Sequence, residues 1–379
     1  MKYGTVILAS VGLVALVLSA PAAVAGPVEL TGHPIGGYYT NGSSTHYYVA
    51  SSLNVKGAIC GGGYGLAFDG PTTVTSFSVD AQPDDGGGRR ILPGFYVYAN
   101  GQVAGYIDMD GTRDAQVDLP IWAVNADRTL ALDGNDQPIP VAITANWLTL
   151  VPKEGSAALG MLAQTGAMQL GYSFHGTPYE SASPTETDLN VGKTVTASGG
   201  TGGGSASSIV TGNLASYHKT NELYWQVNGA DNTGARWATV YYDEATDIGS
   251  VGIALFAGSD GNRRAPVWVE IVGGTMDGLG QEIETGRQAV ILDDVLTYYN
   301  RYNITEPGFD GIDWLRIEFP DVTDENDLAN WWSRSGVTGL TAFQAFADPV
   351  SLATVTAIPE PATMSLLILG GLALRRRRR

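Results

Sequence analysis

The sequence predicts an all-β protein made of two tandem β-sandwiches of the jelly-roll type. Three observations support this fold class: short segments alternate apolar and polar residues, Asp-Gly and Asn-Gly turn dipeptides recur between them, and helical periodicity is sparse. The 50 glycines among 379 residues fit the same class, because tight turns need residues that accept positive φ. With 44% hydrophobic residues, the chain is long enough to form two packed cores.

Alternation with a period of two marks strands that bury one face. The clearest such segments are 77–79, 95–97, 251–255, 267–271 and 315–319. Glycine follows Asp or Asn at the turn signals Asp69, Asn100, Asp110, Asp133, Asn228, Asp260 and Asp277. Residues 153–164 and 324–335 are the candidates for short helices. Many strands and turns with little helix indicate sandwiches rather than a mixed fold.

The two halves of the chain repeat the same motifs in the same order. The matching segments are 74–79 with Arg89-Arg90, 248–253 with Arg263-Arg264, and Trp147-Leu148 with Trp314-Leu315. The Arg pairs lie 174 positions apart (263 − 89). Repetition in a fixed order indicates a duplicated fold. It also favours a structural role for the Arg pairs, bracing a hairpin against acidic neighbours, over binding a carboxylate or sugar hydroxyls.

A segment rich in glycine, serine and proline, 177–204, divides the halves and suits an exposed linker. We expect a signal peptide at 1–25, a first β-sandwich at 26–178, a linker and the start of the second domain at 179–204, a second β-sandwich at 205–352 and a sorting segment at 356–379.

Charge and cysteine content exclude several classes of function. The chain has 38 acidic and 21 basic residues, a net charge of −17, which argues against nucleic acid as a partner. One cysteine excludes an internal disulfide framework and a multi-cysteine metal cluster. Four scattered histidines leave little for a zinc site.

The N-terminus has the parts of a secretory signal peptide. Lys2 precedes an apolar run at 6–18, and Ala23-Val24-Ala25 supplies small residues at the cleavage site. We therefore expect export and cleavage after Ala25. A membrane-anchor helix is the alternative.

The C-terminus has three parts in a fixed order: Pro359-Glu360-Pro361, an apolar segment at 362–374, and five arginines at 375–379. As a helix the apolar segment spans about 20 Å, less than the ~30 Å hydrocarbon core. This order resembles the PEP-CTERM sorting signal. The resemblance implies recognition by exosortase after passage through the secretion machinery, with transient anchoring in the inner membrane by a transmembrane helix. It further implies processing near Pro359, Glu360 and Pro361. The expected destination is the cell surface or extracellular matrix, including biofilm, of a Gram-negative bacterium that makes exopolysaccharide. A crude tail anchor is the alternative reading.

The second half carries further motifs in order. They are Gly192-Lys193-Thr194-Val195-Thr196-Ala197-Ser198, Thr211-Gly212-Asn213, a strand with Trp237, the strand pair within 248–271, and Trp314-Leu315-Arg316-Ile317. This order resembles the discoidin domain (coagulation-factor C type), a galactose-binding-like jelly roll, over residues 188–352. In that family the loop at 211–213 reads Asp-Gly-Asn and often holds a structural calcium. Here Thr211 replaces the Asp. We therefore expect no cofactor, with a structural calcium as the open alternative.

Sugar binding needs an aromatic face that stacks on a pyranose ring and a few polar groups that bond its hydroxyls. The resemblance to the discoidin domain implies that a ligand binds to loops at one end of the sandwich. The candidate ligand-binding residues are Trp331, Trp332, His218, Tyr224, Trp225 and Arg263. In a strand, one member of each consecutive aromatic pair would face outward. Burial of Trp331 and Trp332 in the core is the alternative, and Trp237, Trp268 and Trp314 are expected to fill the core. The comparable cluster of the first half is His46-Tyr47-Tyr48.

Catalytic motifs are lacking in the sequence: it has neither Gly-x-Ser-x-Gly nor His-Glu-x-x-His. The loop from Asp108 has glycine at position four rather than the six of an EF-hand. Paired carboxylates at 293–294 and 321–327 suit solvated turns, with a weak calcium site in the second cluster as an alternative. We therefore expect a protein that is not an enzyme and that binds or adheres to carbohydrate. A structural scaffold is the alternative, and a polysaccharide hydrolase is a third hypothesis.

Overall fold

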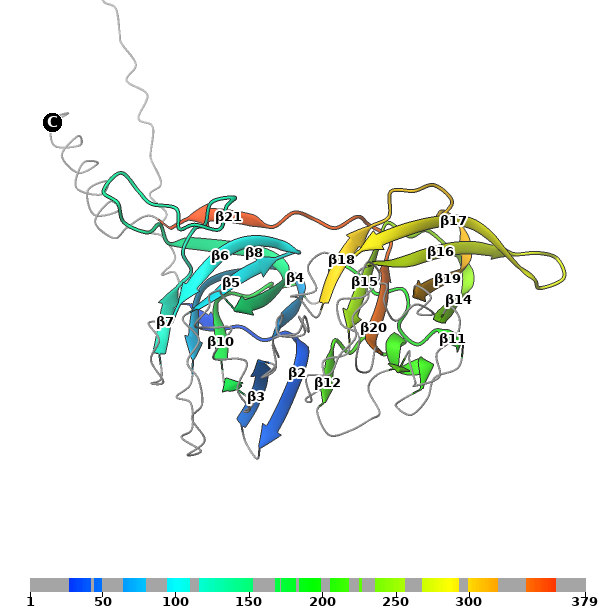
Figure 1. Ribbon diagram of the computed structural model, residues 1–379, viewed down its shortest axis with the longest axis horizontal. Coiled ribbons are helices and arrows are strands. Elements are labelled where there is room, and N and C mark those ends of the chain that lie inside the picture. Colours follow the sequence, from blue (N-terminus) through cyan, green and yellow to red (C-terminus); the bar gives the residue numbers. More distant parts are fainter. Residues whose placement is uncertain are drawn as a thin grey trace, which may run out of the picture.

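Strands make up almost all of the regular structure. The computed structural model describes residues 27–41, 44–49, 64–79, 94–109, 116–152, 168–170, 172–181, 184–198, 205–217, 225–226, 236–255, 268–292, 299–319 and 339–358. Within these ranges the one helical element is the 3-10 helix η1 (Ala206–Val210) (Figure 1). The expected all-β class is confirmed. The expected helices at 153–164 and 324–335 lie outside the described residues.

The strands, in chain order, are β1 (Val28–Glu29), β2 (His33–Asn41), β3 (Ser44–Val49), β4 (Tyr64–Val79), β5 (Gly94–Ala99), β6 (Gln102–Asp108), β7 (Gln116–Pro120), β8 (Val141–Pro152), β9 (Met168–Leu170), β10 (Tyr172–Thr177), β11 (Thr194–Ala197), β12 (Ala215–Tyr217), β13 (Trp225–Gln226), β14 (Arg236–Thr246), β15 (Ser250–Leu255), β16 (Trp268–Met276), β17 (Glu282–Ile291), β18 (Tyr299–Asn303), β19 (Ile312–Phe319), β20 (Gly339–Phe346) and β21 (Thr354–Ala357).

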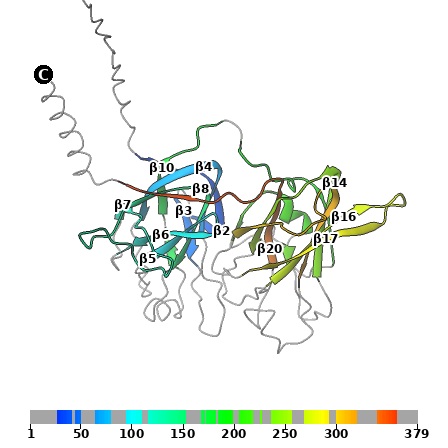
Figure 2. The same cartoon turned by 90° about the horizontal axis from the view of Figure 1, so that it is seen from above.

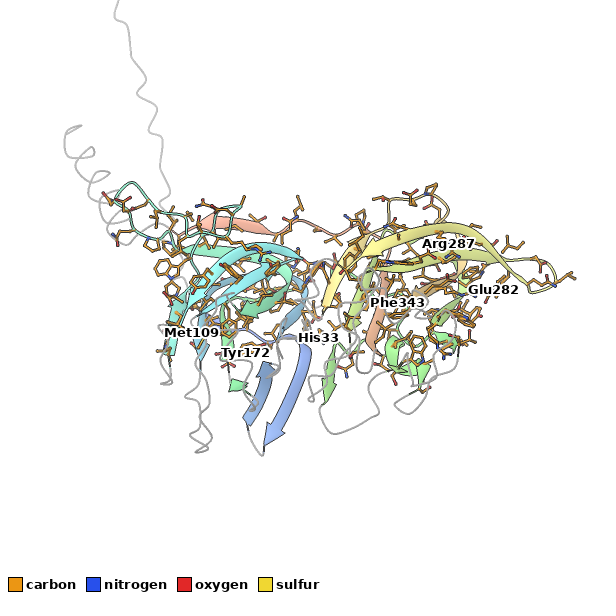
Figure 3. The ribbon with its side chains drawn as sticks, viewed as in Figure 1. His33, Met109, Tyr172, Glu282, Arg287 and Phe343 are labelled. Atoms are coloured by element: carbon orange, nitrogen blue, oxygen red, sulfur yellow. The ribbon has the colours of Figure 1, made fainter. Side chains whose placement is uncertain are left out.

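The second sandwich consists of two antiparallel sheets, β11-β14-β19-β16-β17 and β13-β20-β15-β18. Period-two alternation explains how they pack: in β19, Leu315, Ile317 and Phe319 are buried in the core, while Arg316 and Glu318 are half-buried on the other face. The facing sheet contributes residues such as Phe343 of β20 to the same core (Figure 3).

The first sandwich is joined into a single network of strands by β4. The first part of β4, up to Ala67, pairs with β8 and β2. Thr72 to Val74 pair with β8 again, and the last part of β4 pairs with β10 and β7. Its register with β8 shifts between Ala67 and Thr72, a stretch that contains Asp69-Gly70-Pro71. The expected turn at Asp69 is thus an irregularity inside one strand. Together β4 and β8 connect the series β6-β5-β8-β4-β2 with β7, β10, β1 and β21.

The strand order confirms the duplicated fold. In the first sandwich β6-β5-β8-β4 are consecutive neighbours, and in the second β17-β16-β19-β14 are consecutive neighbours. Each series consists of a hairpin, a strand that contains the Trp-Leu dipeptide, and a long strand. Trp147 pairs with Ala67 as Trp314 pairs with Tyr241. The connections that carry the two Arg pairs, between β4 and β5 and between β15 and β16, are therefore topologically equivalent.

The two sandwiches lie side by side and share a buried junction (Figure 2). Ala254, Tyr299 and Ala342 of the second sandwich belong to the same apolar cluster as the first sandwich's core. Strand β12 pairs in parallel with β2, and β21 pairs antiparallel with β8. Alternate residues of the four-stranded sheet belong to the two apolar clusters, Ala254 to the first and Ile253 to the second, so both faces of this sheet are covered.

Strand β21 changes the expected domain limits. Residues 354–357, at the expected boundary between the second domain and the sorting segment, form an edge strand of the first sandwich along β8 (Figure 1). All four residues are exposed. Their pairing is made by backbone groups, so the alternation of Thr and apolar residues in this strand could not reveal its partner. The N-terminal strand β1 pairs with β10, so both ends of the described chain belong to the first sandwich.

Candidate functional site

Most of the candidate residues lie outside the described residues. This holds for Trp331, Trp332, His218, Tyr224 and Arg263, for His46-Tyr47-Tyr48 as side chains, and for the processing residues Ala25, Pro359, Glu360 and Pro361. The expected apolar C-terminal segment is also outside them. Among the described residues, no helix has the length and apolar character needed to cross a membrane.

Trp225 is a core residue rather than a ligand-binding one. Its side chain is 2% exposed, and its ring meets the Phe319 ring edge-on with centroids 6.2 Å apart. Trp225 also pairs with Leu340 in the four-stranded sheet, whereas Phe319 is the last residue of β19 in the five-stranded sheet. The indole therefore joins the two sheets at one end of the sandwich. A sugar could not stack on a ring buried to this extent, so the expected binding role of Trp225 is wrong.

The strands that flank the candidate segments finish at this same end. Leu255 pairs with Leu340, as Trp225 does, and Arg236 pairs with Phe319. The segments that begin or finish at these strand ends are 218–224, 227–235, 256–267 and 320–338. Strand ends that border these segments thus meet around Trp225, at what we call the Trp225 end of the second sandwich, whereas segment 218–224 begins at β12, which pairs with β2.

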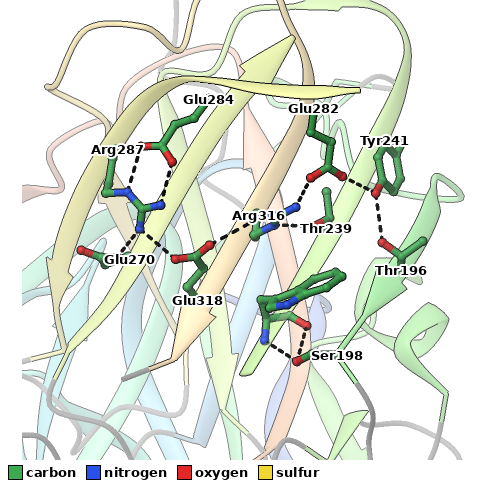
Figure 4. A network of polar contacts seen from close by, with 11 residues as sticks. Thr196, Ser198, Thr239, Tyr241, Glu270, Glu282, Glu284, Arg287, Arg316 and Glu318 are labelled. Carbon is green, nitrogen blue, oxygen red and sulfur yellow. Dashed lines mark hydrogen bonds and ion pairs between the residues drawn. The ribbon is translucent and has the colours of Figure 1, made fainter. Parts of the chain in front are cut away.

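The outer face of the five-stranded sheet carries a continuous polar network (Figure 4). Arg287 of β17 is its centre: Nε and Nη2 donate to the two oxygens of Glu284 at 2.9 and 2.7 Å. Nη1 donates to Glu318 at 2.8 Å and to Glu270. Three carboxylates on three strands therefore share one guanidinium.

Arg316 extends this network toward the other edge of the sheet. Its guanidinium lies 4.7 Å from the Trp237 ring centre and 4.9 Å from that of Trp314. It donates to Thr239 Oγ1 at 2.7 Å and to Glu282. These contacts combine cation–π attraction with charge-assisted hydrogen bonds.

Trp237, Trp268 and Trp314 were expected to fill the core. Of the three, only Trp314 is buried, with 1% of its surface exposed. Trp237 and Trp268 are half-buried. All three alternate with core residues along their strands, so they project from the outer face of the sheet. Trp314 is buried there because it packs over Gly274, and its Nε1 donates to Thr275 O at 3.1 Å.

The carboxylates of the outer face are not arranged for acid catalysis. Hydrogen bonds from Arg287 lower the pKa of Glu284, and the surrounding carboxylates raise the pKa of Arg287. A glycosidase needs one carboxyl that stays protonated near neutral pH. Asp188 does have a raised pKa, caused by burial, but its Oδ1 accepts hydrogen bonds from the Asn190 and Ala345 backbone N–H groups inside the protein. None of these described carboxylates is a suitable proton donor to a substrate.

The loop at 211–213 does not fit a calcium ion. Thr211 Oγ1 donates to Ser208 O at 3.0 Å and accepts from the Asn213 backbone N–H at 3.4 Å. Residues 205–217 contain no carboxylate, whereas calcium sites in proteins usually draw on several. Within the described part of the chain, no group of three or more His, Cys, Asp or Glu residues is placed to hold a metal.

No protein-family model and no curated protein sequence matches the chain. Among solved structures, the lectin domain of lectinolysin complexed with Lewis B antigen is 17% identical, with 42% of this chain and 96% of that chain covered and a TM-score of 0.30. The family 32 CBM of C. perfringens NanJ, in complex with galactose, is 16% identical, with 42% and 98% covered and a TM-score of 0.30. An F5/8 type C domain from Bacteroides fragilis is 13% identical, with 43% and 96% covered and a TM-score of 0.31. At such TM-scores these likenesses carry no argument about fold or ligand.

Proposed function

We propose that this chain is an exported cell-surface or extracellular-matrix protein that binds carbohydrate without catalysis, through the Trp225 end of its second sandwich. The observation that carries the proposal is the convergence of strand ends around Trp225, Phe319 and Leu340. The segments attached there contain the aromatic pair Trp331-Trp332 and also Tyr224, His218 and Arg263. These are the residue types that stack on sugar rings and bond sugar hydroxyls.

The described strands give such a site a rigid base. Trp225, Leu340 and Phe319 are each no more than 2% exposed, and they join both sheets at the Trp225 end. Binding segments that start from packed strand ends lose less entropy when a ligand orders them. The aromatic residues Trp331, Trp332 and Tyr224 would provide stacking faces, and His218 and Arg263 would provide hydrogen bonds.

The charge of the chain narrows the ligand class. A net charge of −17 repels polyanions, so a neutral polysaccharide is favoured over a sulfated or uronate-rich one. Extracellular polysaccharide fits this requirement and fits the surface destination that the C-terminal signal implies.

A glycan array tests the binding site. The purified protein is expected to bind a subset of neutral glycans, and Trp331→Ala, Trp332→Ala and His218→Ala each to weaken binding about tenfold or more. The matched control is Trp237→Ala, which removes an indole on the outer sheet face and should leave binding unchanged. Lack of binding to every glycan, with or without calcium, would exclude the proposal and favour a structural scaffold.

Mass spectrometry of the protein from its native host tests export and sorting. The expected mature chain begins at Gly26 and ends near Pro359-Glu360-Pro361, with exosortase and the secretion machinery as processing partners. Changing Glu360→Ala should leave the tail attached and keep the protein in the inner membrane. A mature chain that retains residues 362–379 would contradict the sorting part of the proposal.

A further inference from the structure

Arg301 of β18 lies where three parts of the chain meet. Its guanidinium is 3.7 Å from the ring centre of Phe346, in the second sandwich, and 4.8 Å from that of Trp147, in the first. Its Nη1 donates to Glu186, in the segment between the sandwiches. Its Nε donates to Tyr299 Oη at 2.6 Å.

The environment of Arg301 exists only when all three parts are assembled. The Arg301 side chain is 7% exposed and that of Glu186 is 16% exposed. A buried charge is costly unless it is paired and hydrogen-bonded, and breaking such a pair leaves the remaining charge uncompensated. Separation of the sandwiches would remove the Trp147 ring from the guanidinium and open the ion pair to water.

Tyr299 links Arg301 to β20 within the same four-stranded sheet. Its hydroxyl accepts from Arg301 and donates to Gln344 Oε1 at 2.7 Å. Burial raises the pKa of Tyr299 to about 12, so the phenol keeps the proton that it donates. The Tyr299 ring also meets the Trp147 ring edge-on at 5.8 Å. The junction therefore combines aromatic packing with a satisfied polar chain.

Strand β15 contributes small residues to the face that the second sandwich turns to the first. On β15, Gly252 and Ala254 alternate with the core residues Val251 and Ile253. A Cβ on Gly252 would lie 2.9 Å from Gln344 Oε1 and 3.1 Å from Tyr299 Oη. All eight residues of β20 are buried. A sheet that faced solvent on one side would show exposed residues at alternate positions.

We infer that the two sandwiches unfold as one cooperative unit with Arg301 as its central contact, so the second sandwich is not an autonomous binding module. The default for two domains in one chain is relative motion across a small polar interface. Here β12 pairs with β2, β21 pairs with β8, and Asn100 Nδ2 donates to Ser351 O at 2.9 Å. The junction thus adds backbone pairing to a buried ion pair and a shared apolar cluster. This inference is independent of what the protein binds.

Hydrogen exchange of the unaltered protein in increasing denaturant tests the inference directly. Amides of β8 in the first sandwich and β20 in the second should lose protection in the same transition. Opening of β20 at a lower denaturant concentration, with β8 still protected, would overturn the inference. This measurement needs no variant to fold.

Substitution of Arg301 tests its place in the junction. Arg301→Gln should lower Tm by roughly 5 °C or more and should separate the β20 transition from the β8 transition. The matched control is Arg287→Gln in the exposed network of the same sandwich, which should leave the two transitions coincident. Equal Tm shifts for the two variants, with coincident transitions in both, would remove Arg301 from its central role.

Two hairpin glycines supply a second, matched pair of variants. Gly101 (φ +80°) and Gly280 (φ +77°) lie in the connections of the corresponding hairpins β5–β6 and β16–β17, and their similar positive φ makes a side chain unfavourable at both. A Cβ on Gly101 would overlap the Asn300 side chain of the other sandwich, whereas nothing lies within 4 Å of a Cβ on Gly280. Gly101→Ala should therefore lower Tm more than Gly280→Ala, and equal shifts would contradict a close junction.

Discussion

Trp147 and Trp314 occupy equivalent positions in the two sandwiches, and each is 1% exposed, but they are buried by different partners. Tyr299 and Arg301 of the other sandwich contact Trp147. Trp314 packs over Gly274 and against Arg316 of its own sheet. One position of the duplicated fold therefore serves assembly in the first half and a surface network in the second.

The contact between Trp314 and Gly274 predicts a sharp effect of one methyl group. A Cβ on Gly274 would overlap the Trp314 ring and Ile283 O. Gly274→Ala should lower the free energy of unfolding by about 1–3 kcal/mol, measured by urea denaturation. Gly278→Ala in the same hairpin, where nothing lies within 4 Å of the new Cβ, is the control and should stay within about 0.5 kcal/mol. Similar values for the two variants would show that the close approach is not a constraint.

Burial of Trp225 predicts a loss of stability rather than a direct loss of a ligand contact. Trp225→Ala should lower the free energy of unfolding by about 3–5 kcal/mol, because it leaves a cavity between Leu340 and Phe319. Denaturation followed by circular dichroism measures this. If Trp225→Ala kept full stability and abolished glycan binding, the residue would belong to the ligand site after all.

The network around Arg287 predicts a small effect that depends on salt. The Arg287 side chain is 36% exposed and that of Glu284 47%, so water screens their attraction. Arg287→Gln should cost about 1 kcal/mol or less in low salt, and the difference from the unaltered protein should shrink in about 1 M salt. A loss above about 3 kcal/mol that salt does not reduce would indicate a core role.

Burial of Asp188 predicts how stability changes with pH. Burial raises its pKa, although backbone N–H groups of Asn190 and Ala345 and the charge of Arg301 act in the opposite direction. An acid with a raised folded-state pKa contributes stability that is full below its unfolded-state pKa and is lost as pH rises through the folded-state pKa. Asp188→Asn should therefore be at least as stable as the unaltered protein near neutral pH, with the advantage vanishing in acid.

Asp243→Asn is the control for this titration, because the effect should have the opposite sign. A hydrogen bond from Lys193 lowers the pKa of Asp243. Its contribution is present above the unfolded-state pKa and is lost as pH falls. Urea denaturation at several pH values between about 4 and 8 measures both variants. An Asp188→Asn protein whose relative stability did not change with pH would contradict the raised pKa.

Local patterns in the sequence predicted the strands and the repeat. Alternation along residues 315–319 correctly gives Leu315 and Ile317 to the core, because successive strand residues face opposite sides. The match between Trp147-Leu148 and Trp314-Leu315 correctly indicates equivalent strands. Hydrophobicity alone misplaced Trp314, since a large aromatic residue can be buried on the outer face of a sheet when a glycine and an arginine cover it.

The order of polar and apolar residues was enough to establish an all-β chain of two related halves, because strand periodicity and turn chemistry act between residues close in sequence. The junction needed the folded chain. Arg301 meets Glu186 across 115 positions, and β21 pairs with β8 although all four of its residues are exposed. Which faces of two related sandwiches become covered is set by contacts between distant segments, and no local periodicity encodes them.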